Sequence, residues 1–186
     1  MSTPDQKVAV ITGASQGIGT GLVDAYRRFG YAVVATSRSI TPSQDPNVIT
    51  VQGDIADTAT AERVTSAAIE RFGRIDTVQI TTSLVDHASS ALPSVLASLT
   101  KGGLQAATRS LAIEYAGRGT RSNAVALGVI KTPMHPQEYH DTLGAMHPMG
   151  RMGEIQDVVD AVLYLEKAPF VTGEILHVDG GQSAGH

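Results

Sequence analysis

Three glycines near the start of the chain have the spacing of a phosphate-binding turn. They lie in Thr12–Gly19 (TGASQGIG), which follows the apolar run Val8–Thr12 and opens into apolar residues at helical intervals. Gly13 permits a sharp turn, Gly17 lets the backbone approach a diphosphate, and Gly19 lets the helix pack closely on the sheet. Because the turn lies between a strand and a helix, it predicts a site where N–H groups at a helix start bind phosphates. The residues expected at this site are Gly13, Ser15, Gln16, Gly17, Ile18 and Gly19.

A turn of this kind is typical of proteins that bind a dinucleotide, and the end of the next strand-like run indicates which dinucleotide the site would bind. About 20 residues beyond such a turn, an acidic side chain binds a ribose 2′-hydroxyl, or an arginine binds a 2′-phosphate. The chain has Ser37 and Arg38 there and no carboxylate. A guanidinium forms a charge-assisted fork to phosphate, so the sequence favours NADP(H) over NAD(H). The alternative is that Arg38 only begins a solvated loop.

Asp54 and Ile55 follow the third strand-like run, Val48–Gln52. They offer an acceptor and an apolar side chain where an adenine would lie. Asp54 could equally cap the helix that follows it.

Short β-branched runs alternate with stretches of helical spacing, which is typical of βα units in a parallel sheet. The sequence therefore predicts a single α/β domain over residues 1–186, a Rossmann-like doubly wound parallel sheet between two helical layers. The expected strands are Val8–Thr12, Ala32–Thr36, Val48–Gln52, Ile75–Thr82, Arg121–Val125 and Ile175–Val178. The turn-rich segment Thr132–Gly153 reads as a long loop, a flap over a site.

Composition narrows the class of protein. The 186 residues carry 14 Lys and Arg against 18 Asp and Glu, a formal net charge of −4, which disfavours nucleic acid and anionic membrane surfaces as partners. The chain has no cysteine and no apolar segment near the roughly 20 residues that span a bilayer, and its first residues are polar. We expect a cytoplasmic protein. Its six histidines lack the spacing of a helical zinc site, so no metal is expected.

Taken in order, these pieces and several later ones resemble the short-chain dehydrogenase/reductase family. The further motifs are Lys101-Gly102-Gly103, Ser122–Val125 (SNAV), Gly128–Pro133 (GVIKTP), Gly150–Gly153 (GRMG) and Val171–Gly181 (VTGEILHVDGG). The resemblance implies a nicotinamide cofactor and hydride transfer to or from a carbonyl or alcohol. In the family a tyrosine passes the proton, a lysine four residues later lowers the pKa of that tyrosine and holds the nicotinamide ribose, and a serine polarises the substrate oxygen.

Carried over residue by residue, the resemblance assigns three kinds of site. Lys101 would hold the ribose, and Thr82 or Ser83 would polarise the substrate oxygen. Gly128, Ile130 and Thr132 would contact the nicotinamide, although Leu127 stands where the family usually has a proline. The alternatives are a surface lysine in a first helical turn for Lys101, and a simple turn closing a strand for Thr82 and Ser83.

The sequence departs from the family pattern in two places. The position four before Lys101 is Ala97, so the tyrosine is absent. The family's NNAG segment, with its asparagine, is missing together with a helix, and two strands read as fused over Ile75–Thr82. We therefore expect six strands, one βα unit fewer than the family, and a homo-oligomer, if one forms, with an altered interface.

The leading hypothesis is a slow NADP(H)-dependent oxidoreductase acting on a small carbonyl or secondary alcohol. Its proton would come from water or from the flap, where Tyr139 is a candidate, whereas Tyr115 fits a buried helical stripe. The second hypothesis is a non-catalytic NADP(H)-binding sensor or regulatory protein. The third is a shortened variant of a longer working protein.

Overall fold

The computed structural model describes residues 6–78, 80–83 and 95–184 of the chain. It divides into two compact units, Met1–Gln79 and Ile80–His186, each built around its own parallel sheet. The single domain expected from the sequence stays a prediction.

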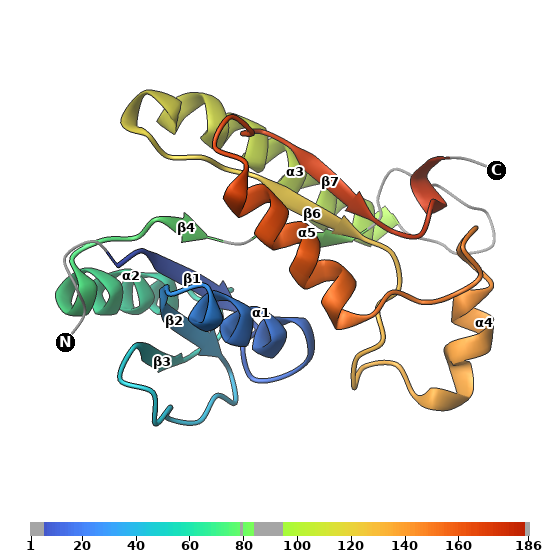
Figure 1. The fold of residues 1–186 in the computed structure, drawn as a ribbon, viewed down its shortest axis with the longest axis horizontal. Helices are drawn as coiled ribbons and strands as arrows, with labels where there is room; N and C mark the ends of the chain where they lie inside the picture. Colours follow the sequence, from blue (N-terminus) through green and yellow to red (C-terminus); the bar gives the residue numbers. More distant parts are fainter. Residues whose placement is uncertain (1–5, 79, 84–94, 185–186) are drawn as a thin grey trace. The chain divides into compact units, whose positions relative to one another are not determined.

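The first unit is a four-stranded parallel sheet between two helices (Figure 1). Its strands are β1 (Val8–Thr12), β2 (Ala32–Ser37), β3 (Val48–Gln52) and β4 (Thr77–Val78), in the spatial order β3-β2-β1-β4. Helix α1 (Gly17–Arg28) joins β1 to β2, and α2 (Thr58–Phe72) joins β3 to β4. The two crossovers run in opposite directions across the sheet, so right-handed connections require the helices to cover opposite faces.

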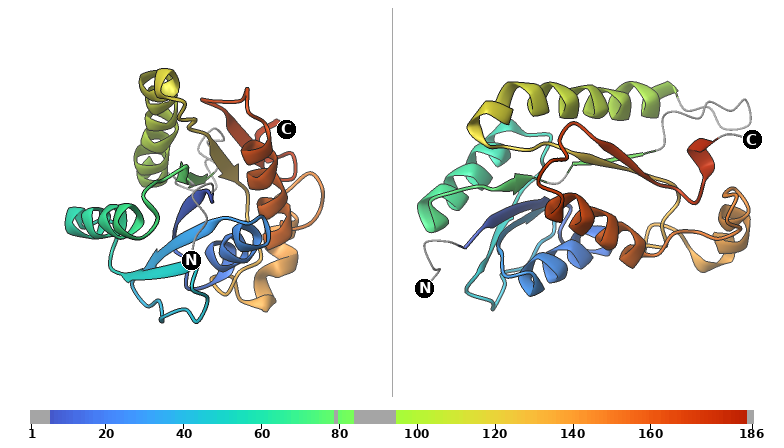
Figure 2. Two further views of the ribbon diagram at one scale, coloured as in Figure 1. Left: turned by 60° about the vertical axis from the view of Figure 1, so that its left-hand side comes forward. Right: turned by 45° about the horizontal axis from the view of Figure 1, so that its top comes forward.

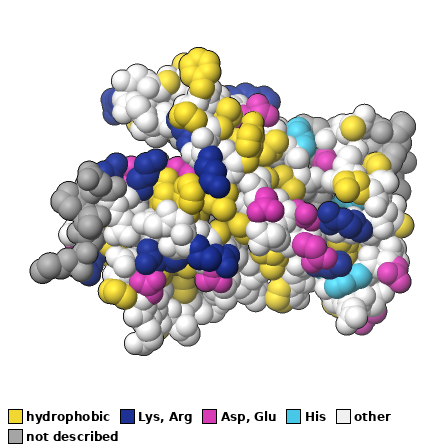
Figure 3. Space-filling model, viewed as in Figure 1, with side chains coloured by type: hydrophobic (Ala, Val, Ile, Leu, Met, Phe, Trp, Pro, Cys, Tyr) yellow, Lys and Arg dark blue, Asp and Glu magenta, His cyan; other side chains and the backbone are white. Residues whose placement is uncertain are grey.

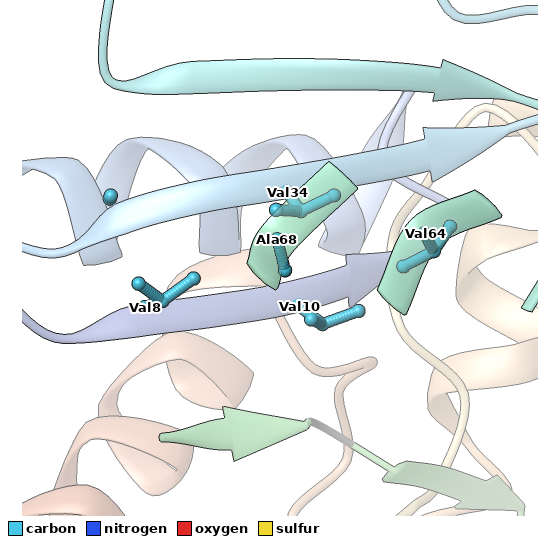
Figure 4. Close-up of a cluster of buried hydrophobic side chains, with 6 residues drawn as sticks. Val8, Val10, Val34, Val64 and Ala68 are labelled. Carbon is cyan, nitrogen blue, oxygen red and sulfur yellow. The ribbon is translucent and has the colours of Figure 1, made fainter. Parts of the chain in front are cut away.

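Alternation along the strands explains how this sheet is buried on both faces. Val8, Val10 and Val34 point to the face where Val64 and Ala68 of α2 pack (Figure 4). Successive residues of a strand point to opposite faces, so the residues between them face α1. Those residues, Ala9, Ile11, Val33 and Ala35, are also buried, as are Leu22, Ala25 and Tyr26 of α1. Because both faces are covered, the strands read as continuous apolar runs in the sequence.

The second unit has a three-stranded parallel sheet in the order β5-β6-β7. Its elements are β5 (Ile80–Ser83), α3 (Val95–Tyr115), β6 (Ala124–Leu127), α4 (His140–Gly144), α5 (Ile155–Lys167) and β7 (Ile175–Val178), with 3₁₀ turns at Ala116–Arg118, Gln137–Tyr139 and Gln182–Ala184. Helices α3 and α5 lie on opposite faces of this sheet (Figures 1 and 2). The α/β fold with parallel strands and helices on both faces is thus confirmed.

The expected single strand over Ile75–Thr82 is wrong. Residues Thr77 and Val78 pair with β1 in the first sheet, whereas Ile80–Ser83 pair with β6 in the second. One stretch of chain therefore changes partners instead of forming one ladder. The described residues hold seven strands in two sheets rather than six in one.

Arg121 explains why β6 begins at Ala124 and not at the expected Arg121. Its guanidinium donates to the carbonyl oxygens of Leu165, Glu166, Ala168 and Val171, at distances of 2.9–3.2 Å. These oxygens lie at and just beyond the end of α5, where a helix leaves carbonyls without partners. Arg121 therefore caps a helix before the strand begins.

Candidate functional site

The glycine turn has the conformation that the sequence predicted. Gly13 and Gly17 both lie in the left-handed region, with φ of 66° and 58°. A Cβ atom added to Gly19 would lie 2.2 Å from the carbonyl oxygen of Gly13, so the turn folds directly onto the first turn of α1. The Ala14 N–H donates to Thr36 O at 3.1 Å, which ties the turn to the end of β2.

Helix α1 begins without a side-chain cap. Its N-cap residue, Gln16, makes no capping hydrogen bond, and its first turn holds no acidic side chain. Ser15 and Gln16 are exposed, and Gly17 and Ile18 are half-buried. The first N–H groups of a helix have no partner within the helix, and the helix dipole is positive there. This end of α1 is therefore able to bind an anion.

The end of β2 lies beside this turn. The Ser39 Oγ is 3.5 Å from the Ser15 Oγ, and the Ser39 N–H donates to the Ser37 Oγ at 3.3 Å. Arg38 is exposed, and its guanidinium has no hydrogen bond or ion pair with any residue that the structure describes. The Thr36 Oγ1 is buried and also lacks a hydrogen-bond partner there. Among the described residues, this edge therefore offers one exposed cation without a partner, and the Thr36 hydroxyl without a partner lies buried behind it.

The segment after β3 shows that Asp54 is not the cap of the following helix, which was one of its two expected roles. The N-cap of α2 is Asp57, whose side chain accepts from the Ala59 N–H at 3.0 Å. Asp54 does not cap the helix; its carboxylate accepts from the Ala56 N–H within the preceding turn. Ile55 is 54% exposed, so an apolar side chain is available at this edge.

In the second unit, Thr82 and Ser83 end β5, in register with Ala126 and Leu127 of β6. The register places both residues at the carboxyl edge of the sheet, where ligands of open α/β sheets bind; their side chains are outside the described part of the structure. Lys101 is half-buried in the second turn of α3, so it is not the first-turn surface lysine of the alternative reading. Ala97, four residues earlier, lies on the same helix.

The segment Gly128–Thr132 follows β6 and is held by backbone contacts. Gly128 N–H donates to Val178 O, Lys131 N–H donates to Gly153 O, and Val129 O accepts from Gly153 N–H, at 2.8–3.1 Å. These contacts hold the two ends of the flap together, and within the described residues the Ile130 N–H has no acceptor. The flap is not the uniform loop expected, because it contains the 3₁₀ turn Gln137–Tyr139 and α4.

A cavity of about 500 Å³ lies beside this segment, entirely within the second unit. It is lined by Gly128 and Val129, by residues of α5 and β7, and by His147 and Asp179. Asp179 is buried, which by itself raises the pKa of its carboxyl group. Hydrogen bonds from Ser183 and Gly181 and the nearby His177 outweigh burial, so the pKa of Asp179 lies below its ordinary value. Sequence reasoning missed Asp179, because its partners, although only two and four residues away, meet it only through the fold of the turn after β7. It gave His147 no role, because the contact with Val129 spans 18 residues of the chain.

Tyr115 and Tyr139, the two tyrosines considered as proton donors, lie in different elements of the second unit. Tyr115 is 37% exposed beneath Arg118, so the expectation that it is buried is wrong. It also ends α3, about 21 Å along the helix from Lys101 at 1.5 Å per residue, toward the amino edge of the sheet. Tyr139 lies in the flap and is 53% exposed.

Among the described residues, no three His, Asp or Glu side chains are grouped as a metal site would require.

The surface carries no large patch of one charge on the face seen in Figure 3, where acidic and basic side chains are interspersed. In the parts of the chain that the structure covers, no helix has the length and apolarity needed to cross a membrane.

Two family models match the chain. Residues 7–92 match the model described as short chain dehydrogenase, and residues 78–183 match the model described as enoyl-(acyl carrier protein) reductase. A putative ketoacyl reductase 2 of the granaticin polyketide synthase, from Streptomyces violaceoruber, is 29% identical over 244 residues, which cover 96% of each chain. Carbonyl reductase family member 4 of Xenopus laevis is 41% identical over 99 residues, 53% of this chain and 42% of that protein.

Solved structures share the fold. ElxO with NADP bound has a TM-score of 0.86 and 23% identity, covering 97% of this chain and 100% of that chain. A blue fluorescent protein from a metagenomic library, in complex with NADPH, has a TM-score of 0.83 and 23% identity, covering 95% and 98%.

Proposed function

Because the chain belongs to the short-chain dehydrogenase/reductase family, we propose that it is an NADP(H)-dependent oxidoreductase acting on a small carbonyl or secondary alcohol. The observation that carries the proposal is the glycine turn at an uncapped helix start, with an arginine at the end of the neighbouring strand that no described residue pairs. ElxO and the blue fluorescent protein, which share the fold, bind NADP or NADPH.

The residues of the first unit fit the adenosine part of NADP(H). A side chain at Gly19 would overlap the backbone of Gly13. Because glycine has no side chain, the turn can fold tightly onto the helix start, where its backbone would contact a diphosphate. Arg38 would bind the 2′-phosphate, because its guanidinium is exposed and unpaired within the described residues. Ser37 would add a hydroxyl donor beside it. Asp54 and Ile55 would contact the adenine.

The residues of the second unit fit the nicotinamide part. Gly128, Ile130 and Thr132 would contact the nicotinamide, and the Ile130 N–H is the donor that the backbone contacts leave unused. Lys101 would hold the ribose, and Thr82 or Ser83 would donate a hydrogen bond to the substrate oxygen. Bound NADPH would supply the hydride for reduction of a carbonyl.

In the family a tyrosine transfers the proton, and in this chain Ala97 stands at that position. Ala97 has no proton to give, and an aliphatic hydroxyl at Thr82 or Ser83 is a weaker acid than a phenol. The proton would therefore come from water or from a flap residue such as Tyr139, and we expect slow turnover. The alignment with the granaticin reductase extends over 244 positions against 186 residues here, which supports an internal segment missing from this chain. Such a loss would remove the family's asparagine and alter any oligomer interface.

A non-catalytic NADP(H)-binding sensor or regulatory protein is the second candidate, favoured by Ala97. NADPH oxidation with a panel of small ketones, run beside a binding titration, separates the two. Binding with measurable oxidation supports the enzyme, and binding with no oxidation of any ketone supports the sensor. Turnover at the rates ordinary for the family would contradict the role given to Ala97, and absence of NADPH binding would contradict both functions.

A further inference from the structure

His147 is buried in the flap, with 3% of its surface exposed, and both of its ring nitrogens have partners. Its Nδ1 is 3.0 Å from the carbonyl oxygen of Leu143. Its Nε2 is 3.0 Å from the backbone nitrogen of Val129. The ring therefore links the end of the short helix α4 to the segment that follows β6.

These partners select one tautomer of the ring. The Leu143 oxygen can only accept, so Nδ1 carries the proton; the Val129 N–H can only donate, so Nε2 is unprotonated. The tautomer with the proton on Nδ1 satisfies both partners, and the tautomer with the proton on Nε2 satisfies neither.

Packing holds the ring against the same segment. A Cβ atom added to Gly128 would lie 2.7 Å from His147 Nε2, and one added to Gly180 would lie 3.2 Å from His147 Cβ. Beside the ring, Met149 N–H donates to Gly180 O at 3.1 Å. The imidazole therefore fills the space between the start of Gly128–Thr132 and the chain after β7.

The charged groups around the ring have partners of their own. Arg151 and Asp157 form an ion pair at 2.8 Å, and Asp160 accepts from Gln156. The Asp179 carboxylate accepts from the Gly181 and Ser183 N–H groups. His177 is exposed on β7 and lies near Asp179. Together these groups line the cavity that His147 also borders.

We propose that His147 is a positioning residue for the nicotinamide end of the cofactor. It holds the Val129 backbone and so sets the position of the neighbouring Ile130 N–H. This inference rests on the proposed NADP(H) function, which assigns Gly128, Ile130 and Thr132 to the nicotinamide. Leu127 lacks the fixed φ of a proline, so the side-chain contact supplies rigidity that the local backbone does not.

The test compares NADPH with 2′,5′-ADP, a fragment that carries the 2′-phosphate but no nicotinamide. His147→Phe keeps a ring and loses both hydrogen bonds, whereas the Oε1 of His147→Gln retains an acceptor for Val129. His140→Gln is the matched control, because His140 is also a flap histidine whose ring, among the described residues, donates only to the His135 carbonyl. Thermal unfolding of each variant is recorded beside the titrations.

We expect NADPH to bind His147→Phe about tenfold more weakly than wild type, because a buried N–H loses its acceptor. Binding of 2′,5′-ADP should be unchanged, and His147→Gln should recover most of the NADPH affinity. His140→Gln should bind both ligands as wild type does. A long-range proton–nitrogen spectrum of the wild-type protein should show the His147 proton on Nδ1.

Each other result overturns the inference. Equal loss of both ligands in His147→Phe would mean a general structural role, and loss of neither would mean that His147 positions nothing. A proton on Nε2 would contradict the hydrogen-bond assignment. If the wild type binds 2′,5′-ADP, and the His147 variants bind NADPH with the same affinity as the wild type, the proposed function stands and this inference fails. If the wild type binds neither ligand, both fail.

Discussion

Replacing Gly19 by alanine tests whether the glycine turn is built for close approach. The new Cβ would lie 2.2 Å from Gly13 O, 2.6 Å from Gly13 C and 2.9 Å from Ala14 Cα, all backbone atoms. No side chain can rotate away, so the turn and the start of α1 must separate by most of an ångström. Overpacking of this kind costs about 1–3 kcal/mol, and the better helix propensity of alanine offsets up to about 1 kcal/mol of it. We expect a net loss of about 1–2 kcal/mol of unfolding free energy, or a Tm lower by about 2–8 °C.

Gly103→Ala is the matched control, since a Cβ there meets nothing within 4 Å and the residue is exposed inside α3. It should raise the stability by about 0.5–1 kcal/mol. Circular dichroism gives the two melting curves, and calorimetric titration with NADPH should show at least about tenfold weaker binding for Gly19→Ala only. If Gly19→Ala melts at or above the wild-type temperature and binds NADPH normally, the reasoning on this turn is refuted.

Three further changes have defined outcomes. Arg38→Gln should weaken NADPH binding by about 10- to 100-fold in calorimetry and leave NADH binding unchanged, because only NADPH carries the 2′-phosphate. Arg121→Met should lower the unfolding free energy by about 2–3 kcal/mol in denaturant titrations, because it uncaps the end of α5. Asp179 has a pKa below its unfolded value of about 3.9, so its ionised carboxylate stabilises the fold above that pH and the contribution is lost as pH falls through the folded pKa. Asp179→Asn should therefore be less stable than wild type at pH 7, with a difference that shrinks toward pH 3.

Controls and contrary results for these changes are equally definite. Arg28→Gln removes an exposed arginine from the end of α1 and should leave the preference for NADPH intact; equal loss of NADPH and NADH in Arg38→Gln would contradict the 2′-phosphate role. Lys131→Met breaks an exposed ion pair with Glu154 and should cost no more than about 1 kcal/mol. An Arg121→Met variant as stable as Lys131→Met would refute the cap. A stability difference for Asp179→Asn that is the same at pH 7 and pH 3 would contradict the ionised carboxylate.

The parts of the fold that local sequence determines were predictable. The bounds of β1, β3 and β7 agree with the expected strands, because each is a short apolar run between turn residues. The turn at Gly13–Gly19 was predictable for a similar reason, since positive φ and close approach both select glycine. These features depend on residues close together in the chain.

Features that depend on distant partners were not predictable. Nothing within Ile75–Thr82 indicates that the chain changes sheets there, because the choice is made by pairing with β1 and β6. The same holds for Arg121, whose carbonyl partners lie more than 40 residues away. In the sequence His147 is one of three loop histidines; its proposed role depends on the contact with the Val129 N–H, which lies 18 residues away in the chain and is formed only by the fold. The assignments of Thr82, Ser83 and Lys101 stay predictions.

Calorimetric titration of the wild-type chain with NADPH and with NADH measures the central proposal directly. The geometry of the glycine turn and the exposed Arg38 predict saturable NADPH binding with a Kd on the order of micromolar, and NADH binding at least about tenfold weaker. The absence of binding heat with both nucleotides at several temperatures would contradict it.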